Sequence, residues 1–145
     1  MKLAEALILR SEYQKRIENI QSRIMINLKV QENDKPHENP EELLKEAFDI
    51  NEQLCVLVKK INAKNNAVRL SNGQLLSEAL IDRDMLLKKR KLLASVTAKA
   101  SEKDYRLTHA EIKMHTTLSI GEMQKQIDNL SRSFRELDTQ IQAIN

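Results

Sequence analysis

The hydrophobic positions of this chain follow two helical seams, one near each end of the sequence. In the first, the residues recur at steps of three and four from Leu3 to Asn27, with Arg10 as an interruption. The second is apolar throughout and comprises Met123, Ile127, Leu130, Phe134, Leu137, Ile141 and Ile144. This spacing aligns side chains on one helix face for three heptads or more, so it predicts long helices packed along narrow apolar stripes, as in a coiled coil.

Breaks in the period divide the chain into four predicted helices, at about residues 2–28, 41–66, 78–103 and 120–144. Pro40 suits the first turn of the second helix, because proline cannot continue a preceding one. Ser77 is expected to cap the third helix, and Ser119 with Glu122 forms a capping box before the fourth. We therefore expect a mainly α protein, a single domain over residues 1–145 with its four helices in an antiparallel bundle.

Two segments between the helices predict a small β element at one end of the bundle, at about residues 68–76 and 112–118. Asn72-Gly73 between short apolar pieces is typical of a two-residue hairpin turn, in which both residues have positive φ. From Ile112 to Ile120 apolar and polar residues alternate with the period of a strand. We expect the two segments to pair.

The composition agrees with long helices and indicates where in the cell the protein is located. The chain has two Gly and two Pro among 145 residues, and 31% of its residues are charged. The one cysteine, Cys55, cannot form an internal disulfide. No run of 18 apolar residues occurs, and the N-terminus enters a charged amphipathic helix rather than an apolar signal segment. We expect a cytoplasmic protein.

The net charge of +3 conceals an uneven distribution. Residues 32–52 contain eight acids and two lysines, whereas residues 88–99 contain five bases and no acid. A basic stretch can bind nucleic acid, but this one has neither interleaved aromatics nor a known binding motif. A solvated helix face that complements the acidic segment is the favoured interpretation.

No residues combine into a catalytic or metal-binding motif. His109, Glu111 and His115 lack a recognised ligand spacing, and no second cysteine is available. Glycine-rich phosphate loops and nucleophile turns are also missing from the sequence. We therefore predict no catalytic residues, no metal, no cofactor and no small-molecule substrate, and hence a protein that is not an enzyme.

Polar residues on the seams are the main chemical lead, and they are Arg10, Asn27, Asn65, Arg83 and Arg90. A buried guanidinium is costly unless it is paired. Possible acidic partners are Asp84, Glu111, Asp128 and Glu136. We expect one hydrogen-bonded network where the first three helices meet, formed by Arg10, Asn62, Asn65, Arg83 and Asp84. Such a network either fixes helix register or forms a pocket for an anion or a partner's carboxylate.

Several short motifs resemble a bacterial family labelled septicolysin. They begin with Lys2-Leu3-Ala4-Glu5-Ala6-Leu7 and Gln14-Lys15-Arg16-Ile17, and continue with Ile61-Asn62, Asn65, Gly73, Glu78-Ala79-Leu80, Arg83-Asp84 and Leu137-Asp138. The resemblance covers nearly the whole chain. It implies a membrane-active, pore-forming cytolysin, a toxin whose catalytic residues and mechanism the label does not specify.

These observations leave three hypotheses for the function. The first is a non-enzymatic helical bundle that self-associates or binds a protein partner, and a homo-oligomer is expected because six apolar residues lie off the seams: Leu7, Ile8, Leu44, Val58, Leu75 and Leu92. The second is the pore-forming cytolysin that the resemblance implies. The third is nucleic-acid binding through the basic part of the third helix.

Overall fold

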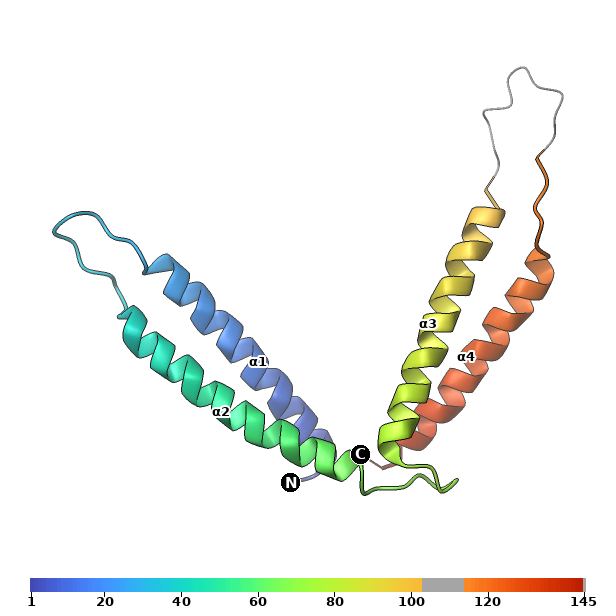
Figure 1. Ribbon diagram of the computed structural model, residues 1–145, viewed down its shortest axis with the longest axis horizontal. Coiled ribbons are helices and arrows are strands. Elements are labelled where there is room, and N and C mark those ends of the chain that lie inside the picture. Colours follow the sequence, from blue (N-terminus) through green and yellow to red (C-terminus); the bar gives the residue numbers. More distant parts are fainter. Residues whose placement is uncertain (103–113, 145) are drawn as a thin grey trace, which may run out of the picture. The chain divides into compact units, whose positions relative to one another are not determined.

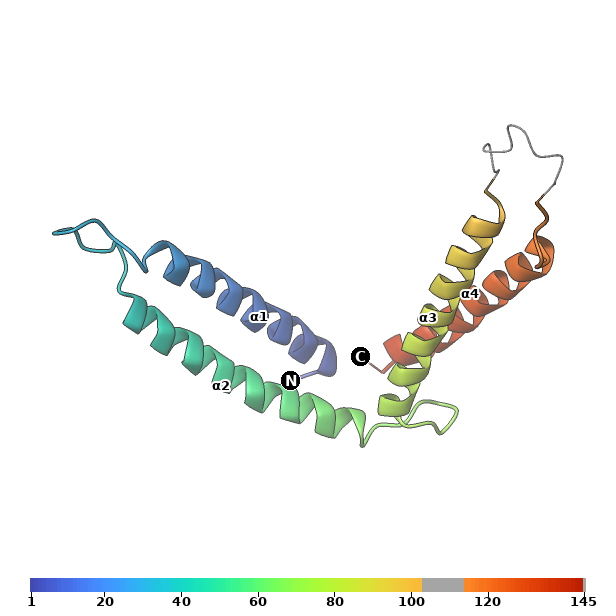
Figure 2. The ribbon, with the colours of Figure 1, turned by 45° about the horizontal axis from the view of Figure 1, so that its top comes forward.

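The computed structural model describes residues 1–102 and 114–144, and this part of the chain forms four helices (Figure 1). They are α1 (Leu3–Ile26), α2 (Pro40–Asn65), α3 (Leu76–Ala100) and α4 (Ile120–Gln142). About 74% of the described residues are helical, which confirms the mainly α prediction. The helices pack in pairs, α1 beside α2 and α3 beside α4, as both ribbon views show (Figure 2).

Each helix pair belongs to its own compact unit. The first unit contains residues 1–68 and the second contains residues 69–144. In both, two antiparallel helices are joined at one end, so each unit is a helical hairpin. The grouping of all 145 residues into one domain stays a prediction.

The core of the first hairpin follows the predicted seams. On α1 the buried residues are Leu3, Ala6, Ile20 and Ile24, and on α2 they are Leu43, Ile50, Leu57 and Ile61. Ile20, Ile24, Leu43 and Ile50 form one cluster, against which Tyr13, Ile17 and Ala47 pack. Because these positions recur every three or four residues, they meet along a single line between the two helices.

The second hairpin follows its predicted seam less closely. Met123 and Ile141 of α4 are buried, and the seam residues between them are half-buried. On α3, Leu76 and Ala79 are buried, but Arg90 is exposed, so its predicted interior position is wrong. A layer of two helices is open along both sides, and the long stem of an arginine can carry its charge from the seam to water.

The helix ends show which capping predictions were correct. Pro40 is the first residue of α2, and the Asn39 side chain accepts a hydrogen bond from the Glu41 N–H at 3.0 Å. The Ser119 hydroxyl accepts one from the Glu122 N–H at 3.3 Å at the start of α4. The predicted Ser77 cap is wrong, because α3 begins at Leu76 with Leu75 as its N-cap. Burial of Leu76 fixes this end without a side-chain cap.

The turn before α3 is a hairpin of a different kind from the one predicted. Arg69 and Leu75 form an antiparallel bridge, and the Leu70 N–H donates to the Gln74 carbonyl at 2.8 Å. Gly73 has a φ of 87°, whereas Asn72 has no positive φ. The Asn72 side chain instead accepts from the Gln74 N–H at 2.9 Å, an arrangement typical of Asx turns. The predicted two-residue turn is therefore wrong, and a three-residue loop with Gly73 in the left-handed region takes its place.

The second predicted β segment is not a strand where the structure describes it. Residues 114–118 have no strand pairing, and residues 112 and 113 lie outside the described residues. Alternation of apolar and polar residues gives a strand only where a neighbouring backbone supplies hydrogen bonds. The turn at residues 69–75 forms its own bridge, and no bridge joins it to the described residues 114–118.

The Ile20–Ile24–Leu43–Ile50 cluster generates a stability prediction. Ile50 is 3% exposed, so Ile50→Ala removes buried methyl groups and leaves a cavity beside α1. We expect a loss of about 3 kcal/mol in the free energy of unfolding, measured by urea denaturation. Met25→Ala is the matched control, because Met25 is exposed and its truncation should cost less than about 0.5 kcal/mol. Equal effects of the two substitutions would contradict this packing.

Candidate functional site

The predicted polar network is distributed over both hairpins. Arg10 on α1 and Asn65 on α2 are half-buried, and Asn62 is exposed. Within the first hairpin, no hydrogen bond joins these three residues. Arg83 and Asp84 lie on α3, where Arg83 is half-buried and Asp84 is exposed. A single network of all five residues stays a prediction.

Arg83 has an acidic partner that sequence reasoning missed. Its Nη1 donates to Oδ1 of Asp138 on α4 at 2.7 Å, and the two side chains are 25% and 34% exposed. Asp138 directly follows the seam residue Leu137, and a residue that flanks a seam can reach across to the neighbouring helix. No local feature separates Asp138 from the other acids that lie beside a seam, so the sequence alone could not single it out. Glu111, one of the partners considered, lies outside the described residues.

A second polar cluster lies where the loop between α1 and α2 begins and ends. Arg23 makes a bidentate ion pair with Glu38, with its Nε 3.0 Å from Oε2 and its Nη2 close to Oε1. Asn27 is buried, donates from Nδ2 to the Arg23 carbonyl at 2.8 Å, and accepts from the Glu38 N–H at 3.2 Å. The hydrogen bond from Arg23 lowers the pKa of Glu38 and raises that of Arg23. This seam asparagine therefore holds the loop against the end of α1.

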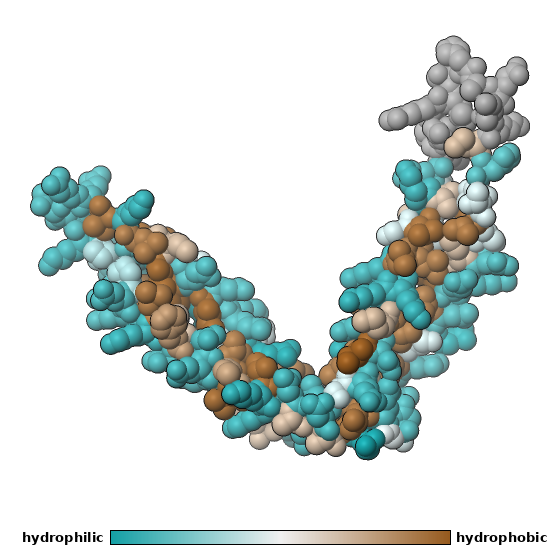
Figure 3. Space-filling model, in the orientation of Figure 1, coloured by the Kyte–Doolittle hydropathy of each residue, from teal (hydrophilic) through white to brown (hydrophobic). Residues whose placement is uncertain are grey.

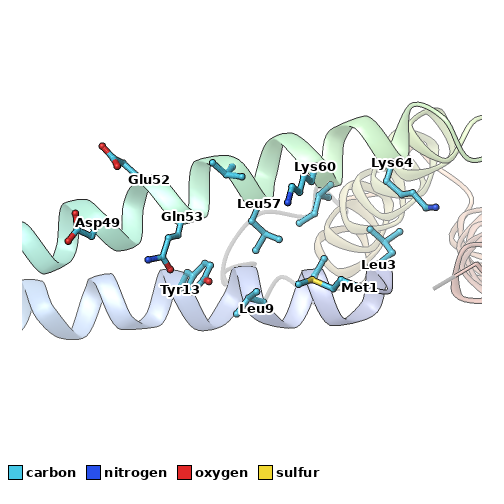
Figure 4. A pocket seen from close by; sticks show the side chains of 13 residues that line it. Met1, Leu3, Leu9, Tyr13, Asp49, Glu52, Gln53, Leu57, Lys60 and Lys64 are labelled. Carbon is cyan, nitrogen blue, oxygen red and sulfur yellow. The ribbon is translucent and has the colours of Figure 1, made fainter.

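A groove runs between α1 and α2 and has a volume of about 860 Å³ (Figure 4). Its wall on the α1 side consists of Met1, Leu3, Ala6, Leu9 and Tyr13. The α2 side contributes Val56, Leu57 and Ile61 together with polar residues toward the two ends. Apolar side chains also form a stripe along this hairpin between hydrophilic borders (Figure 3). The groove is open to solvent and is not an enclosed cavity.

Charged residues of opposite sign lie toward the two ends of the groove. Asp49 and Glu52 are at one end, and Lys60 and Lys64 are at the other, near Met1 (Figure 4). All four are exposed and come from α2. Sequence reasoning missed this site because the four residues lie beside the seam, where a polar residue on a solvated face is expected. Only the approach of α1 makes that face the wall of a groove.

Two of the residues considered for metal binding lie in the part of the chain that the structure describes. His115 and Cys55 are exposed, and His109 and Glu111 fall outside the described residues. Among the described residues, no group of three or more His, Cys, Asp or Glu side chains could hold a metal ion.

The basic stretch that begins at Lys88 lies on α3, and its first four charged side chains are exposed to solvent. Lys88, Lys89, Arg90 and Lys91 are all exposed. Four consecutive helical residues point in directions about 100° apart, so these charges surround most of the helix instead of forming one stripe. That distribution is typical of a solvated helix and gives no flat basic surface for a nucleic-acid backbone.

Comparison with known proteins gives a family and a structural neighbour. Residues 10–145 match a family described as "Family of unknown function (DUF6847)". A crystal structure of a functionally unknown conserved protein from Corynebacterium diphtheriae is similar, with 37% identity and a TM-score of 0.90. The match covers 99% of this chain and 94% of that one. The comparison with curated proteins found no match, and none of these findings supports the septicolysin resemblance. None of the helices in the described part of the chain has the length and hydropathy that a membrane span requires.

The Arg83–Asp138 ion pair should be measurable by a double-mutant cycle. Because both side chains are partly shielded from water, we expect Arg83→Met and Asp138→Asn to couple by about 1 kcal/mol in the free energy of unfolding. Arg90→Met replaces Arg83→Met in the control cycle, because Arg90 lies on the same helix but is exposed. Its coupling to Asp138 should be near zero. Equal coupling in the two cycles would rule out a specific pair.

The Arg23–Glu38 pair should make the free energy of unfolding depend on pH in the acidic range. The pKa of Glu38 is lower in the folded protein than in the unfolded chain. The ion pair therefore contributes fully to the free energy of unfolding above the unfolded pKa of about 4.3, and this contribution is lost as pH falls through the folded pKa. The difference in unfolding free energy between the wild type and Glu38→Gln should therefore shrink at acid pH, as measured by urea denaturation across a pH series. Glu12→Gln, an exposed change on α1, is the control. The same pH dependence in both variants would contradict the assignment.

Proposed function

The chain belongs to the family of unknown function DUF6847, and from the geometry of its first hairpin we propose that it is a non-enzymatic protein that acts by associating with protein chains, first of all with its own copies. The single observation that carries this proposal is the groove between α1 and α2. It presents apolar side chains in the middle and charges toward both ends, the arrangement of a protein interface with an apolar centre and a polar rim.

Apolar residues outside the groove support association as well. Of the six off-seam residues, Ile8, Leu44 and Leu92 are exposed, with exposed fractions of 61%, 41% and 68%. Leu7, Val58 and Leu75 are half-buried beside the helix pairs. A single exposed leucine is ordinary, but several along two-helix layers leave apolar surface that a protein contact would remove from water.

The ionisable residues of the groove favour binding over catalysis. Asp49 and Glu52 are exposed, as are Lys60 and Lys64, and the acids lie toward the end opposite to the lysines. Acid–base and electrostatic catalysis depend on groups that converge on one reacting centre in a water-excluding site. Exposed charges at separate ends of an open groove are better suited to orienting a partner. Location in the cytoplasm remains part of the proposal.

Sedimentation equilibrium tests the proposal directly. We expect the purified full chain to show a mass above that of the monomer at micromolar concentration, with a concentration-dependent distribution of species. Dissociation on dilution would give the affinity. Monomer mass across the whole range would overturn self-association as the function of this surface.

A nucleic-acid gel shift checks the competing hypothesis for α3. Because its exposed cations are spread around the helix, we expect no retarded band at physiological salt with either DNA or RNA. A retarded complex that weakens steeply as salt rises would instead favour nucleic-acid binding. Lys88→Gln combined with Lys91→Gln would then have to abolish that band for the basic stretch to be its cause.

A further inference from the structure

We propose that the α1–α2 groove is completed by the same groove of a second copy of this chain, related by a two-fold axis that passes near Val56. The inference rests on the proposed self-association and deepens it, because it names the surface, the relative direction of the helices and the charged pairs. Val56 lies in the middle of the charge sequence on α2 and is 54% exposed although it lines the groove.

The order of charges along α2 is self-complementary about this residue. Glu52 precedes Val56 by four positions and Lys60 follows it by four. Asp49 precedes Val56 by seven positions and Lys64 follows it by eight. All of these residues line the groove, because steps of three and four keep them on one helix face. The acidic half of the face therefore mirrors the basic half around a central apolar residue.

A two-fold axis turns that mirror relation into contacts between opposite charges. When an axis perpendicular to α2 passes near Val56, the two α2 helices run antiparallel, and each position before Val56 faces the equivalent position after it. Glu52 then faces Lys60 of the second copy, and Asp49 faces position 63, which is next to Lys64, with each pair formed twice. A parallel arrangement would instead set Glu52 against Glu52 and Lys60 against Lys60, so charge alone selects the antiparallel dimer.

The apolar part of the groove supports the same occupant. Leu9 and Tyr13 line the α1 side, and Val56 and Leu57 lie between the charged ends on α2. A hairpin has only two helices, so this face has no third element of its own unit to cover it. Two hairpins packed face to face would bring four helices together, bury Val56 near the axis and leave the charged pairs at the rim.

Charge reversal tests the proposed pairing in the full-length protein. Glu52→Lys places a lysine opposite Lys60 at two symmetric contacts, and Lys60→Glu places a glutamate opposite Glu52 twice. We expect each variant alone to weaken the dimer on the order of tenfold in Kd, measured by sedimentation equilibrium at low salt. An equimolar mixture should regain wild-type affinity, because each contact in the heterodimer then joins a lysine to a glutamate.

Controls separate this pairing from a general effect of charge. Glu18→Lys and Lys15→Glu reverse exposed charges of α1 that do not line the groove, and both should leave the Kd unchanged. Circular dichroism checks that every variant keeps its helical content. A wild type that dimerises but is indifferent to Glu52→Lys and Lys60→Glu would overturn the proposed interface and leave self-association standing. Weakening by both variants without rescue in the mixture would overturn the antiparallel pairing.

Crosslinking locates the axis and identifies any other occupant. Val56→Cys in a Cys55→Ser background should form a disulfide-linked dimer under mild oxidation, because equivalent residues near a two-fold axis meet. Ile8→Cys in the same background is the control, since Ile8 is exposed but does not line the groove. Absence of the Val56→Cys crosslink would overturn the position of the axis. A monomer whose Val56→Cys thiol resists alkylation would overturn the dimer and point to a different occupant of the groove.

Discussion

Two helices packed side by side can bury only the side chains that lie between them, and the rest of this structure depends on that constraint. Ile20, Ile24, Leu43 and Ile50 satisfy it by meeting along one line between α1 and α2. Residues one position away from that line, such as Leu9 and Val56, remain accessible. A pair of helices therefore has a narrow core and a broad accessible surface on either side of it. The polarity of the side chains on that surface decides what the hairpin can bind.

Polar residues follow the same constraint. A seam arginine that was sealed from water would need full compensation for its lost hydration. Here Arg83 pairs with Asp138 at the side of the α3–α4 seam, where both retain some contact with solvent. Arg90 needs no protein partner, because it is exposed. Asn27 is the buried exception, and its two backbone hydrogen bonds satisfy it while they fasten the following loop.

The groove between α1 and α2 is where the accessible surface of the first hairpin bears on function. Its apolar centre would lower the free energy of association by leaving water, while its charged ends would add direction at little cost, since exposed ion pairs are weak but selective. The similarity to a functionally unknown protein from Corynebacterium diphtheriae extends over 99% of this chain, so the two share the fold of both hairpins. That similarity gives the fold but no function. The proposal of a self-associating protein rests on the groove of the first hairpin, whose apolar centre and charged ends give a chemical reason for association.

The sequence alone specified the four helices of this protein. The seams from Leu3 to Asn27 and from Met123 to Ile144 specified helices and their inward faces, and Asn39-Pro40 and Ser119 specified where two of them begin. These features are local, because the periodicity and the capping of a helix depend on residues that are close together in the sequence. For the same reason the helices could be located without knowledge of their neighbours.

Contacts between distant parts of the chain were decided only by the tertiary structure. Asp138 lies 55 residues from Arg83, and nothing local distinguishes it from other acids beside a seam. The turn at Asn72-Gly73 took a three-residue form because the Asn72 side chain bonded to Gln74, which the dipeptide does not reveal. The groove likewise required α1 to lie beside the charged face of α2. Periodicity fixes which residues share one helix face, whereas a site between two helices depends on which faces meet.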